Sequence, residues 1–381
     1  MTRVVGVDLA RLAALVGMFA AHLISPADPR GPGGVDALFQ VVAGRSSALF
    51  ALLAGVGIAL ASRGAAADPA GHRLRLVVRS GLVALVGLAL GGLPSGLAVI
   101  LAFYGVLFLC ALPVLTWRAR SLAVLALAWG LASPVVSLLL RRLVGAPGKI
   151  VPSLPDLAHP GELGLELLLT GYYPVLTWAT YLFAGMAVGR LDLRRATAGP
   201  RLALTGAWLA TLALATSALL TSAPGVRSAL LADQGLATGD WAQLDTQLRR
   251  GLHGTHPAGS GWWLGVWSPH SGSVVDLAHT TGCALLVLGL ALWLVRLVPA
   301  LPWRVLAGAG AMTLTLYSTH VVVLASPFGA RGEVALLVHT VLALVVGAAF
   351  AAVPTRGPLE AMVSATTRLV PLPVPAASRP D

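Results

Sequence analysis

The sequence predicts an all-α integral membrane protein, a polytopic bundle of about ten transmembrane helices. The first observation is composition: 57% of the 381 residues are hydrophobic and 11% are charged, whereas soluble domains carry about 25% charged residues. The second is a mean hydropathy of +0.83. The third is the recurrence of apolar stretches of about twenty residues, the length that crosses a bilayer. We therefore expect the lipid bilayer to surround most of this chain.

Ten apolar stretches are long enough to span, and Pro or Gly interrupts several of them, which membrane helices tolerate. We place the spans at 5–25, 38–61, 75–92, 95–116, 121–140, 172–190, 202–222, 274–296, 303–325 and 334–353. Residues 1–353 then form one transmembrane domain. Cys110 and Cys283 fall in apolar spans and are expected to be small core residues.

The distribution of Lys and Arg predicts the orientation. With the N-terminus inside, seventeen of these residues fall in cytoplasmic segments and nine on the opposite side, which is the bias of the positive-inside rule. We expect both termini in the cytoplasm and the protein in a bacterial inner (plasma) membrane. Short basic loops account for the net charge of +11, so nucleic acid is not an expected partner.

Three segments lie outside the spans. The outer loop 141–171 is rich in Pro and Gly, and the outer loop 223–273 contains four Trp and three His. That second composition suits stacking on a sugar ring; the alternative is that its Trp residues are anchors at the membrane interface. Residues 354–381 predict a short amphipathic helix on the cytoplasmic face, followed by a disordered tail.

The first span carries ionisable residues at an informative spacing. His22 is eleven positions after Arg11, which is about three helical turns and about 16 Å along the axis, on one stripe. Asp8 precedes Arg11 by three residues and can pair with it. Ionisable groups in a membrane helix tend to face the bundle interior. His22 is a candidate general base, and the alternative is a core histidine bonded to a carbonyl.

Other polar residues are predicted at a similar depth near the outer face. Arg45 lies about two turns into the second span and is a candidate site residue. The alternative is that Arg45 forms a structural pair with Asp36 or Asp276. Asp276 and His279 share a face of the eighth span, and His320 lies near the outer end of the ninth. We expect His22, Arg45, Asp276, His279 and His320 to line one cavity open to the outer side. No compact metal-ligand spacing is present, and His339 is expected to be a satisfied core residue.

These residues also carry a resemblance. Arg11, ten intervening residues and His22, with Asp8 ahead, resemble the first helix of the membrane acyltransferase-three family. Longer stretches resemble YeiB-like proteins and bacterial relatives of heparan-alpha-glucosaminide N-acetyltransferase. These stretches are GRSSALFALLAGVGIAL (44–60), GYYPVLTWATYLFAGMAVGRLDL (171–193), PHSGSVVDLAHTTGCALLVLG (269–289), GAMTLTLYSTH (310–320) and RGPLEAMV (356–363).

The resemblance implies an acyltransferase that moves an acyl group, most simply acetyl, from cytoplasmic acyl-CoA to an outer acceptor such as a glycan or lipid-linked sugar. His22 would act as general base or carry the acyl group, and Arg11 with Asp8 would serve the donor site. A homo-oligomer is compatible with this pattern. The lysosomal enzyme of the family uses a luminal histidine after the corresponding helix; this chain has SPADPRGPGGVDAL there (25–38), without His. The alternatives are a transporter or flippase that uses the same polar path, and a scaffold subunit without chemistry.

Overall fold

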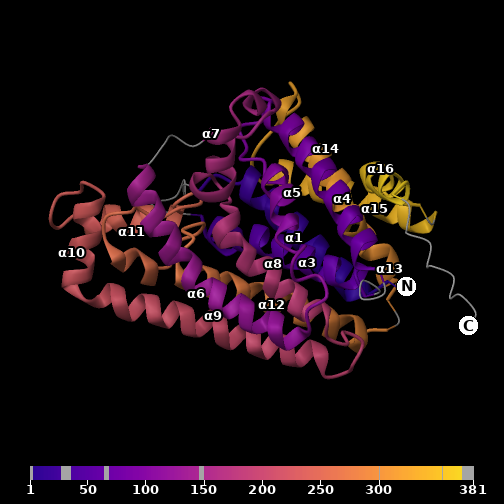
Figure 1. Ribbon diagram of the computed structural model, residues 1–381, viewed down its shortest axis with the longest axis horizontal. Coiled ribbons are helices and arrows are strands. Elements are labelled where there is room, and N and C mark those ends of the chain that lie inside the picture. Colours follow the sequence, from indigo (N-terminus) through magenta and orange to yellow (C-terminus); the bar gives the residue numbers. More distant parts are fainter. Residues whose placement is uncertain are drawn as a thin grey trace, which may run out of the picture.

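The computed structural model describes residues 3–26, 36–63, 68–145, 150–299, 301–353 and 355–370. Within these ranges every regular element is a helix, as the sequence predicts (Figure 1). The longer helices are α1 (Val5–Leu23), α3 (Arg45–Ala61), α4 (Pro69–Gly91), α6 (Ala119–Val144), α8 (Val175–Gly189), α9 (Ala198–Ser222), α12 (Val274–Leu297), α14 (Thr313–Ala325) and α15 (Glu333–Ala352). The shorter ones are α2 (Ala37–Val42), α5 (Leu101–Leu109), η1 (Leu154–Ala158), α7 (Pro160–Leu165), η2 (Glu166–Thr170), α10 (Pro224–Asp233), α11 (Trp241–Arg250), η3 (Gly261–Gly265), α13 (Trp303–Leu306), η4 (Ala309–Ala311) and α16 (Pro358–Arg368).

Seven helical segments in the described residues are long and apolar enough to cross a membrane, with α2 and α3 counted as one. The predicted spans 95–116, 172–190 and 303–325 instead contain shorter helices. The first holds only α5 and following turns, and α8 begins after Pro174. The third is broken between α13 and α14, where Gly310 lets the chain contact the backbone of α1 at Asp8. Within the described residues, seven of the ten predicted spans therefore form long helices, and three form shorter or broken ones.

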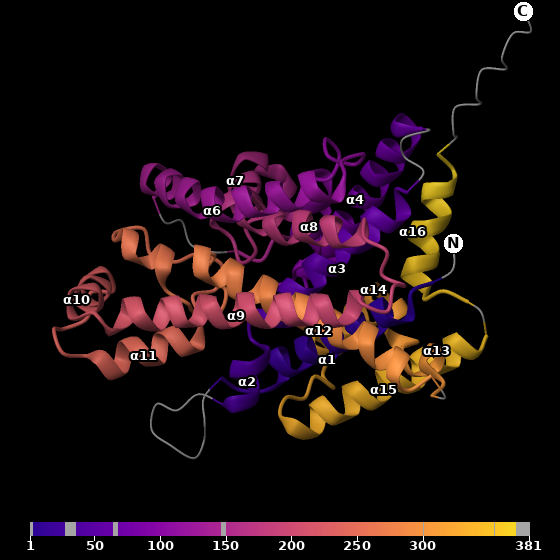
Figure 2. The same ribbon diagram turned by 90° about the horizontal axis from the view of Figure 1, so that it is seen from below.

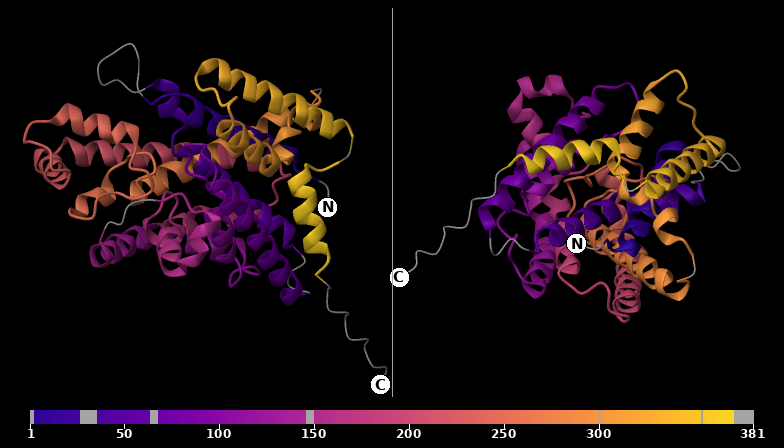
Figure 3. Two further views of the ribbon diagram at one scale, coloured as in Figure 1. Left: turned by 90° about the horizontal axis from the view of Figure 1, so that it is seen from above. Right: turned by 90° about the vertical axis from the view of Figure 1, so that its right-hand side faces the viewer.

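The bundle has two ends that differ in what covers them. We call the end that carries residues 3–4 and α16 the terminal end, and the end that carries α10, α11 and η1 the loop end. Figure 2 shows α10 and α11 at one extreme and α16 at the other, and Figure 3 shows α16 lying across its end of the bundle. α16 occupies the segment for which a short helix is predicted; the predicted disordered tail lies beyond the described residues.

Helix α1 lies inside the bundle and contacts α3, α12, α14 and α15. Its stripe side chains Leu15 and Met18 are buried. The apolar stripe predicted between Arg11 and His22 is therefore the core-facing side of this helix. This placement leaves Arg11 and His22 half-buried within the protein.

The most extensive contact in the described chain joins α9 and α12. Gly199 lies against Gly289, and Gly206 against Gly282, so that two glycines seven residues apart on each helix face each other. Any side chain at these positions would collide with the opposite backbone. Small residues at such positions let membrane helices approach closely, and we call this contact the glycine seam.

Candidate active site

The N-terminal half of α1 begins a cluster of charge at the terminal end. The buried carboxylate of Asp8 accepts hydrogen bonds from Arg3 and from Arg11, the latter at 3.2 Å. The predicted contact between Asp8 and Arg11 is therefore confirmed. Because Asp8 is shared by two guanidinium groups, the cluster retains positive charge.

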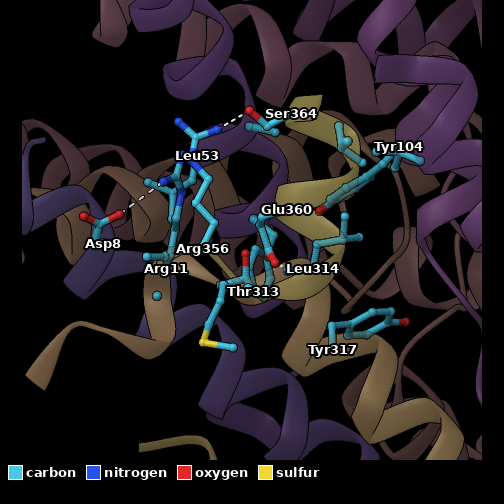
Figure 4. A pocket seen from close by; sticks show the side chains of 18 of the residues that line it. Asp8, Arg11, Leu53, Tyr104, Thr313, Leu314, Tyr317, Arg356, Glu360 and Ser364 are labelled. Carbon is cyan, nitrogen blue, oxygen red and sulfur yellow. Dashed lines mark hydrogen bonds and ion pairs between the residues drawn. The ribbon is translucent and has the colours of Figure 1, made fainter. Parts of the chain in front are cut away.

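A cavity of about 570 Å³, which we call the terminal cavity, opens beside this cluster (Figure 4). Its charged lining residues are Arg3, Asp8, Arg11, Arg79, Arg356 and Glu360. Four cations and two anions leave a formal charge of +2 in its wall. Arg79 is exposed, and its guanidinium carbon lies 5.7 Å from the centroid of the Phe108 ring, within the reach of about 6 Å of a cation–π contact. The cavity can thus attract an anionic ligand.

Helix α16 supplies part of the wall of the terminal cavity. The Glu360 carboxylate accepts hydrogen bonds from the backbone N–H of Leu314 at 2.7 Å and from the N–H and hydroxyl of Thr315 at 3.2 and 2.6 Å. It therefore satisfies N–H groups at the start of α14, where a carboxylate is favourable. Since Glu360 is engaged with α14, the arginines remain the groups able to bind a ligand's charge.

The deep part of the terminal cavity reaches Met18, Ile100 and Tyr317. The ring of Tyr317 lies 6.3 Å from the ring of His22. Figure 4 shows Tyr317 well apart from Arg11 and Arg356, which lie on the other side of the view. The cavity therefore leads from guanidinium groups toward an imidazole.

His22 belongs to a cluster of three imidazoles that we call the histidine cluster: His22, His320 and His339. Nδ1 of His22 lies 3.1 Å from Nε2 of His320, and the two rings are stacked. The ring of His339 stands edge-on to His320 at 4.9 Å, with its Nδ1 bonded to the Ala335 carbonyl at 2.9 Å. The sequence expectation for His339 was a core residue, and its contact with His320 was not foreseen.

A segment that we call the wall, residues 93–101, lies beside the histidine cluster. Arg331 donates to the carbonyls of His22 at 2.7 Å and Ser95 at 3.1 Å and so ties α1 to the wall. The N–H of Ile100 donates to the Tyr317 hydroxyl at 3.4 Å. Ile100 and Leu101 line the terminal cavity, whereas residues 93 and 96–98 line a second cavity of about 640 Å³ toward the loop end. The wall thus lies between the two cavities.

Arg45 and His279 form a separate group on α3 and α12. Arg45 Nε donates to His279 Nε2 at 3.0 Å, and its guanidinium lies over the Trp267 ring at 5.1 Å. Arg45 also donates to the carbonyls of Gln40 and Val41, whereas Asp36 caps α2 instead of pairing with Arg45.

Asp276, one turn before His279, accepts a hydrogen bond from the Gly272 N–H at 3.0 Å. Its contacts are with the backbone that begins α12. Of the five residues expected around one cavity, four are therefore connected in two pairs, His22 with His320 and Arg45 with His279. Asp276 is bonded to the backbone of Gly272 instead. The physical reason is that equal depth in the membrane does not specify which helices are neighbours. Among the described residues, no group of three or more His, Cys, Asp and Glu side chains is arranged to hold a metal ion.

At the loop end, the segment 223–273 is bound to α6 by two arginines. Arg141 donates to the carbonyl of His256, and Arg142 donates to the carbonyls of Ala258, at 2.7 Å, and Gly259. Burial, with a smaller effect of the Arg141 charge, lowers the pKa of His256 from 6.5 to about 4. The histidine is therefore neutral near pH 7, as its contact with a guanidinium requires.

These features define a polytopic helical membrane protein with a cationic cavity whose lining residue Tyr317 lies beside the histidine cluster. A family model described as "Heparan-alpha-glucosaminide N-acetyltransferase, catalytic" matches residues 3–220, more than half of the chain. The chain belongs to this family of membrane acetyltransferases. A search of curated proteins found no match. The matched part contains Asp8, Arg11, His22 and Arg45, whereas Asp276, His279 and His320 lie beyond it.

Several lining residues were not selected from the sequence. Arg79 lies within an expected span, and an arginine there is itself a signal of function. Arg356 and Glu360 follow the last span and were assigned only to a surface helix. Tyr317 lies one turn before His320, on the same helix. Its proximity could have been derived from helical spacing.

Proposed function

We propose that this protein transfers an acetyl group from acetyl-CoA, bound in the terminal cavity, to an acceptor that enters from the loop end. The terminal end would face the cytoplasm of a bacterium and the loop end the outside of the plasma membrane, in agreement with the distribution of arginine. Within the family, we place the chain with its YeiB-like bacterial members, on the stretches quoted above. Family membership favours this proposal over a transporter or flippase.

The observation that carries the proposal is the terminal cavity. Guanidinium groups form charge-assisted hydrogen bonds with phosphates. Arg11, Arg79 and Arg356 line the cavity and would hold the phosphates of coenzyme A, although Arg11 also pairs with Asp8 and Arg356 with the Ser364 hydroxyl. Beyond them the lining is largely apolar, with Leu53 and Phe108, and suits a pantetheine arm. The thioester would then lie near Ile100 and Tyr317, next to the histidine cluster.

The chemistry requires one base. Nδ1–H of His22 donates to Nε2 of His320 in the tautomer that leaves His22 Nε2 without a proton. The acceptor oxygen attacks the thioester carbonyl carbon, and His22 Nε2 takes the proton of the acceptor hydroxyl. The carbon–sulfur bond then breaks, and the thiolate of coenzyme A takes the proton from His22. The products are an acetyl ester and free coenzyme A.

His320 is a positioning residue in this scheme. Its hydrogen bond selects the tautomer of His22 and orients the ring, as the carboxylate does in other acyltransferases that use histidine. The contact of Arg331 with the His22 carbonyl holds the end of α1 at the wall. Arg45 and His279 do not enter this step; their contacts support a structural pairing of α3 with α12.

Coenzyme A binding to the purified protein tests the proposal. Arg79→Gln and Arg356→Gln should each weaken binding about 10- to 100-fold, because a hydrogen bond to a charged group contributes about 1.5–3 kcal/mol. Arg195→Gln is the matched control: Arg195 lies in the 190–197 loop between α8 and α9, pairs with Asp192 and is highly exposed. Equal affinity in the parent and both cavity variants would exclude the terminal cavity as the donor site.

A further inference from the structure

Two ring nitrogens of the histidine cluster are buried without a hydrogen-bond partner in the part of the chain that the structure describes. They are Nδ1 of His320 and Nε2 of His339. A buried polar atom that stays unpaired is destabilising, and such atoms are rare in folded proteins. The two rings are direct neighbours, since they stand edge-on with their centroids 4.9 Å apart. Two unpaired nitrogens on neighbouring rings therefore require a common explanation.

A ligand in one of the cavities does not provide the missing partner. The described lining residues include neither His320 nor His339, whether in the terminal cavity or in the cavity of about 640 Å³ toward the loop end, which we call the loop cavity. The ring of Phe19 packs on both imidazoles instead, with centroid distances of 4.5 Å to His320 and 5.8 Å to His339. A buried phenyl ring supplies no donor or acceptor of the ordinary kind. Each imidazole is therefore a candidate partner for the other.

The backbone of α15 determines where His339 carries its proton. Nδ1 of His339 lies 2.9 Å from the carbonyl oxygen of Ala335, one helical turn earlier. A carbonyl oxygen can only accept a hydrogen bond, so the proton of the neutral ring is on Nδ1. Nε2 of His339 then has a lone pair and can act only as an acceptor. A second proton on this ring would create a buried cation with an unpaired N–H, which is more costly still.

The two neutral tautomers of His320 are then not equivalent. With the proton on Nε2 of His320, both unpaired atoms are acceptors, and they cannot bond to each other. With the proton on Nδ1, one unpaired atom is a donor and the other an acceptor, so a single hydrogen bond satisfies both. Nε2 of His320 is then free to accept from Nδ1–H of His22, which is 3.1 Å away. This second arrangement pairs every nitrogen of the cluster except Nε2 of His22.

We propose that His339 is a positioning residue, which fixes the tautomers of His320 and His22 through a hydrogen bond from Nδ1–H of His320 to its own Nε2. The bond forms after a small turn of the His339 ring about χ2, a torsion with a broad minimum, or through one bridging water. All three rings then carry their proton on Nδ1, and Nε2 of His22 is left as the base. The consequence for catalysis rests on the proposed function, whereas the order of the protons does not.

The tautomers can be measured on the full chain in lipid bilayers. Solid-state NMR of isotope-labelled histidine distinguishes a protonated from a bare ring nitrogen, at about pH 8, where free histidine is neutral. His72 is an internal reference, because its Nδ1 lies 2.8 Å from the carbonyl oxygen of Asp68, four positions earlier, as Nδ1 of His339 lies against Ala335. We expect His320 to carry its proton on Nδ1, like His72. A proton on Nε2 of His320 would overturn the inference.

Two substitutions of His339 separate its hydrogen bond from its volume. His339→Gln keeps an acceptor oxygen at the end of the side chain, whereas His339→Leu keeps apolar bulk without any acceptor. We expect His320 to retain its Nδ1 proton in the Gln variant and to lose this preference in the Leu variant. His72→Leu is the matched control and should leave the signals of His320 as in the parent. If His339→Leu also leaves them unchanged, His339 does not set the tautomer and the inference is wrong.

Turnover provides a readout that a merely structural role would not divide in this way. With saturating acetyl-CoA and water as acceptor, release of coenzyme A should slow about 3- to 10-fold in His339→Leu, the effect of losing one neutral hydrogen bond. In His339→Gln it should slow less than about twofold, and the KM for acetyl-CoA should be the same in both. Parental turnover in His339→Leu would exclude the positioning role.

The two proposals can fail separately. A chain that orders these protons on Nδ1 but neither binds coenzyme A nor consumes acetyl-CoA would overturn the proposed function alone. A chain that consumes acetyl-CoA while His320 carries its proton on Nε2 would overturn the inference about His339 alone. Coenzyme A binding in the same samples also shows that each variant is folded.

Discussion

The terminal cavity and the loop cavity are of similar size, about 570 and 640 Å³, and both are bordered by the wall at residues 93–101. They differ in charge: arginines dominate the first lining, whereas the second combines tyrosine, histidine and leucine. They also differ in construction. Helices, including α16, enclose the terminal cavity, whereas turns of the outer segment 223–273 form part of the loop cavity. The terminal cavity thus has a cationic lining, whereas none of the described residues that line the loop cavity is charged.

The largest expected effect concerns His22, which lies beside the wall. His22→Gln should lower the rate of acetyl transfer about 10²- to 10⁴-fold, the usual contribution of a general base. Coenzyme A affinity should stay within about twofold, because the substitution leaves the arginines in place. Turnover measured with saturating donor, together with donor binding, provides the check, and His159→Gln is the control. Transfer at the parental rate would show that the histidine cluster is structural.

A smaller effect concerns the stability of the loop end. In the folded chain the pKa of His256 is lowered to about 4 from 6.5. A histidine with a lowered folded pKa contributes its full stability above pH 6.5 and loses it as pH falls toward 4, because the unfolded chain then binds the proton. The expected loss is about 2 kcal/mol at about pH 5 relative to pH 7.

Thermal unfolding of the parent and of His256→Gln at both pH values measures this effect. The variant should have lower stability at neutral pH and a weaker dependence on acid. The substitution should not change the terminal end, so coenzyme A binding at pH 7 should be the same in the parent and the variant. A parallel pH dependence in parent and variant would mean that another group titrates.

The smallest expected effect is a response to salt. Raising ionic strength from about 0.05 to 0.5 M shortens the screening length from about 14 to about 4 Å. Donor binding in the arginine-lined cavity should weaken severalfold, and it should weaken less in Arg79→Gln, which lacks one of these charges. Titrations at the two salt concentrations give both numbers. Equal salt dependence of the parent and the variant would mean that the charge of this cavity does not hold the donor.

Composition was enough to predict the helical membrane fold, because few soluble proteins have so few charges. The number of continuous helices was harder to predict from the sequence. The stretch 303–325 is largely apolar, yet its chain breaks at Gly308–Gly310, where Gly310 packs on α1. Hydropathy reports the preference for lipid and contains no information on such a contact, which depends on a partner far away in the sequence.

The candidate site shows the same division. The pairing of Asp8 with Arg11 follows from helical spacing alone, and the structure contains it. The meeting of His22 with His320 depends on α14 lying beside α1, and depth in the membrane suggested it only together with Arg45 and His279. His339 joined the histidine cluster without any local signal. The catalytic role of each of these residues stays a prediction.

The glycine seam between α9 and α12 has a consequence for how the chain is made. These two helices are consecutive long spans, so they can enter the bilayer as a hairpin whose arms fit together before the remaining spans are synthesised. The hairpin would carry residues 223–273 across the membrane as a tethered loop, with His253 and His270 near its returning arm. Replacing Gly206 or Gly282 with a larger residue would then disturb insertion first and ligand binding only as a result. The glycine seam would in this way determine whether the loop cavity forms at all.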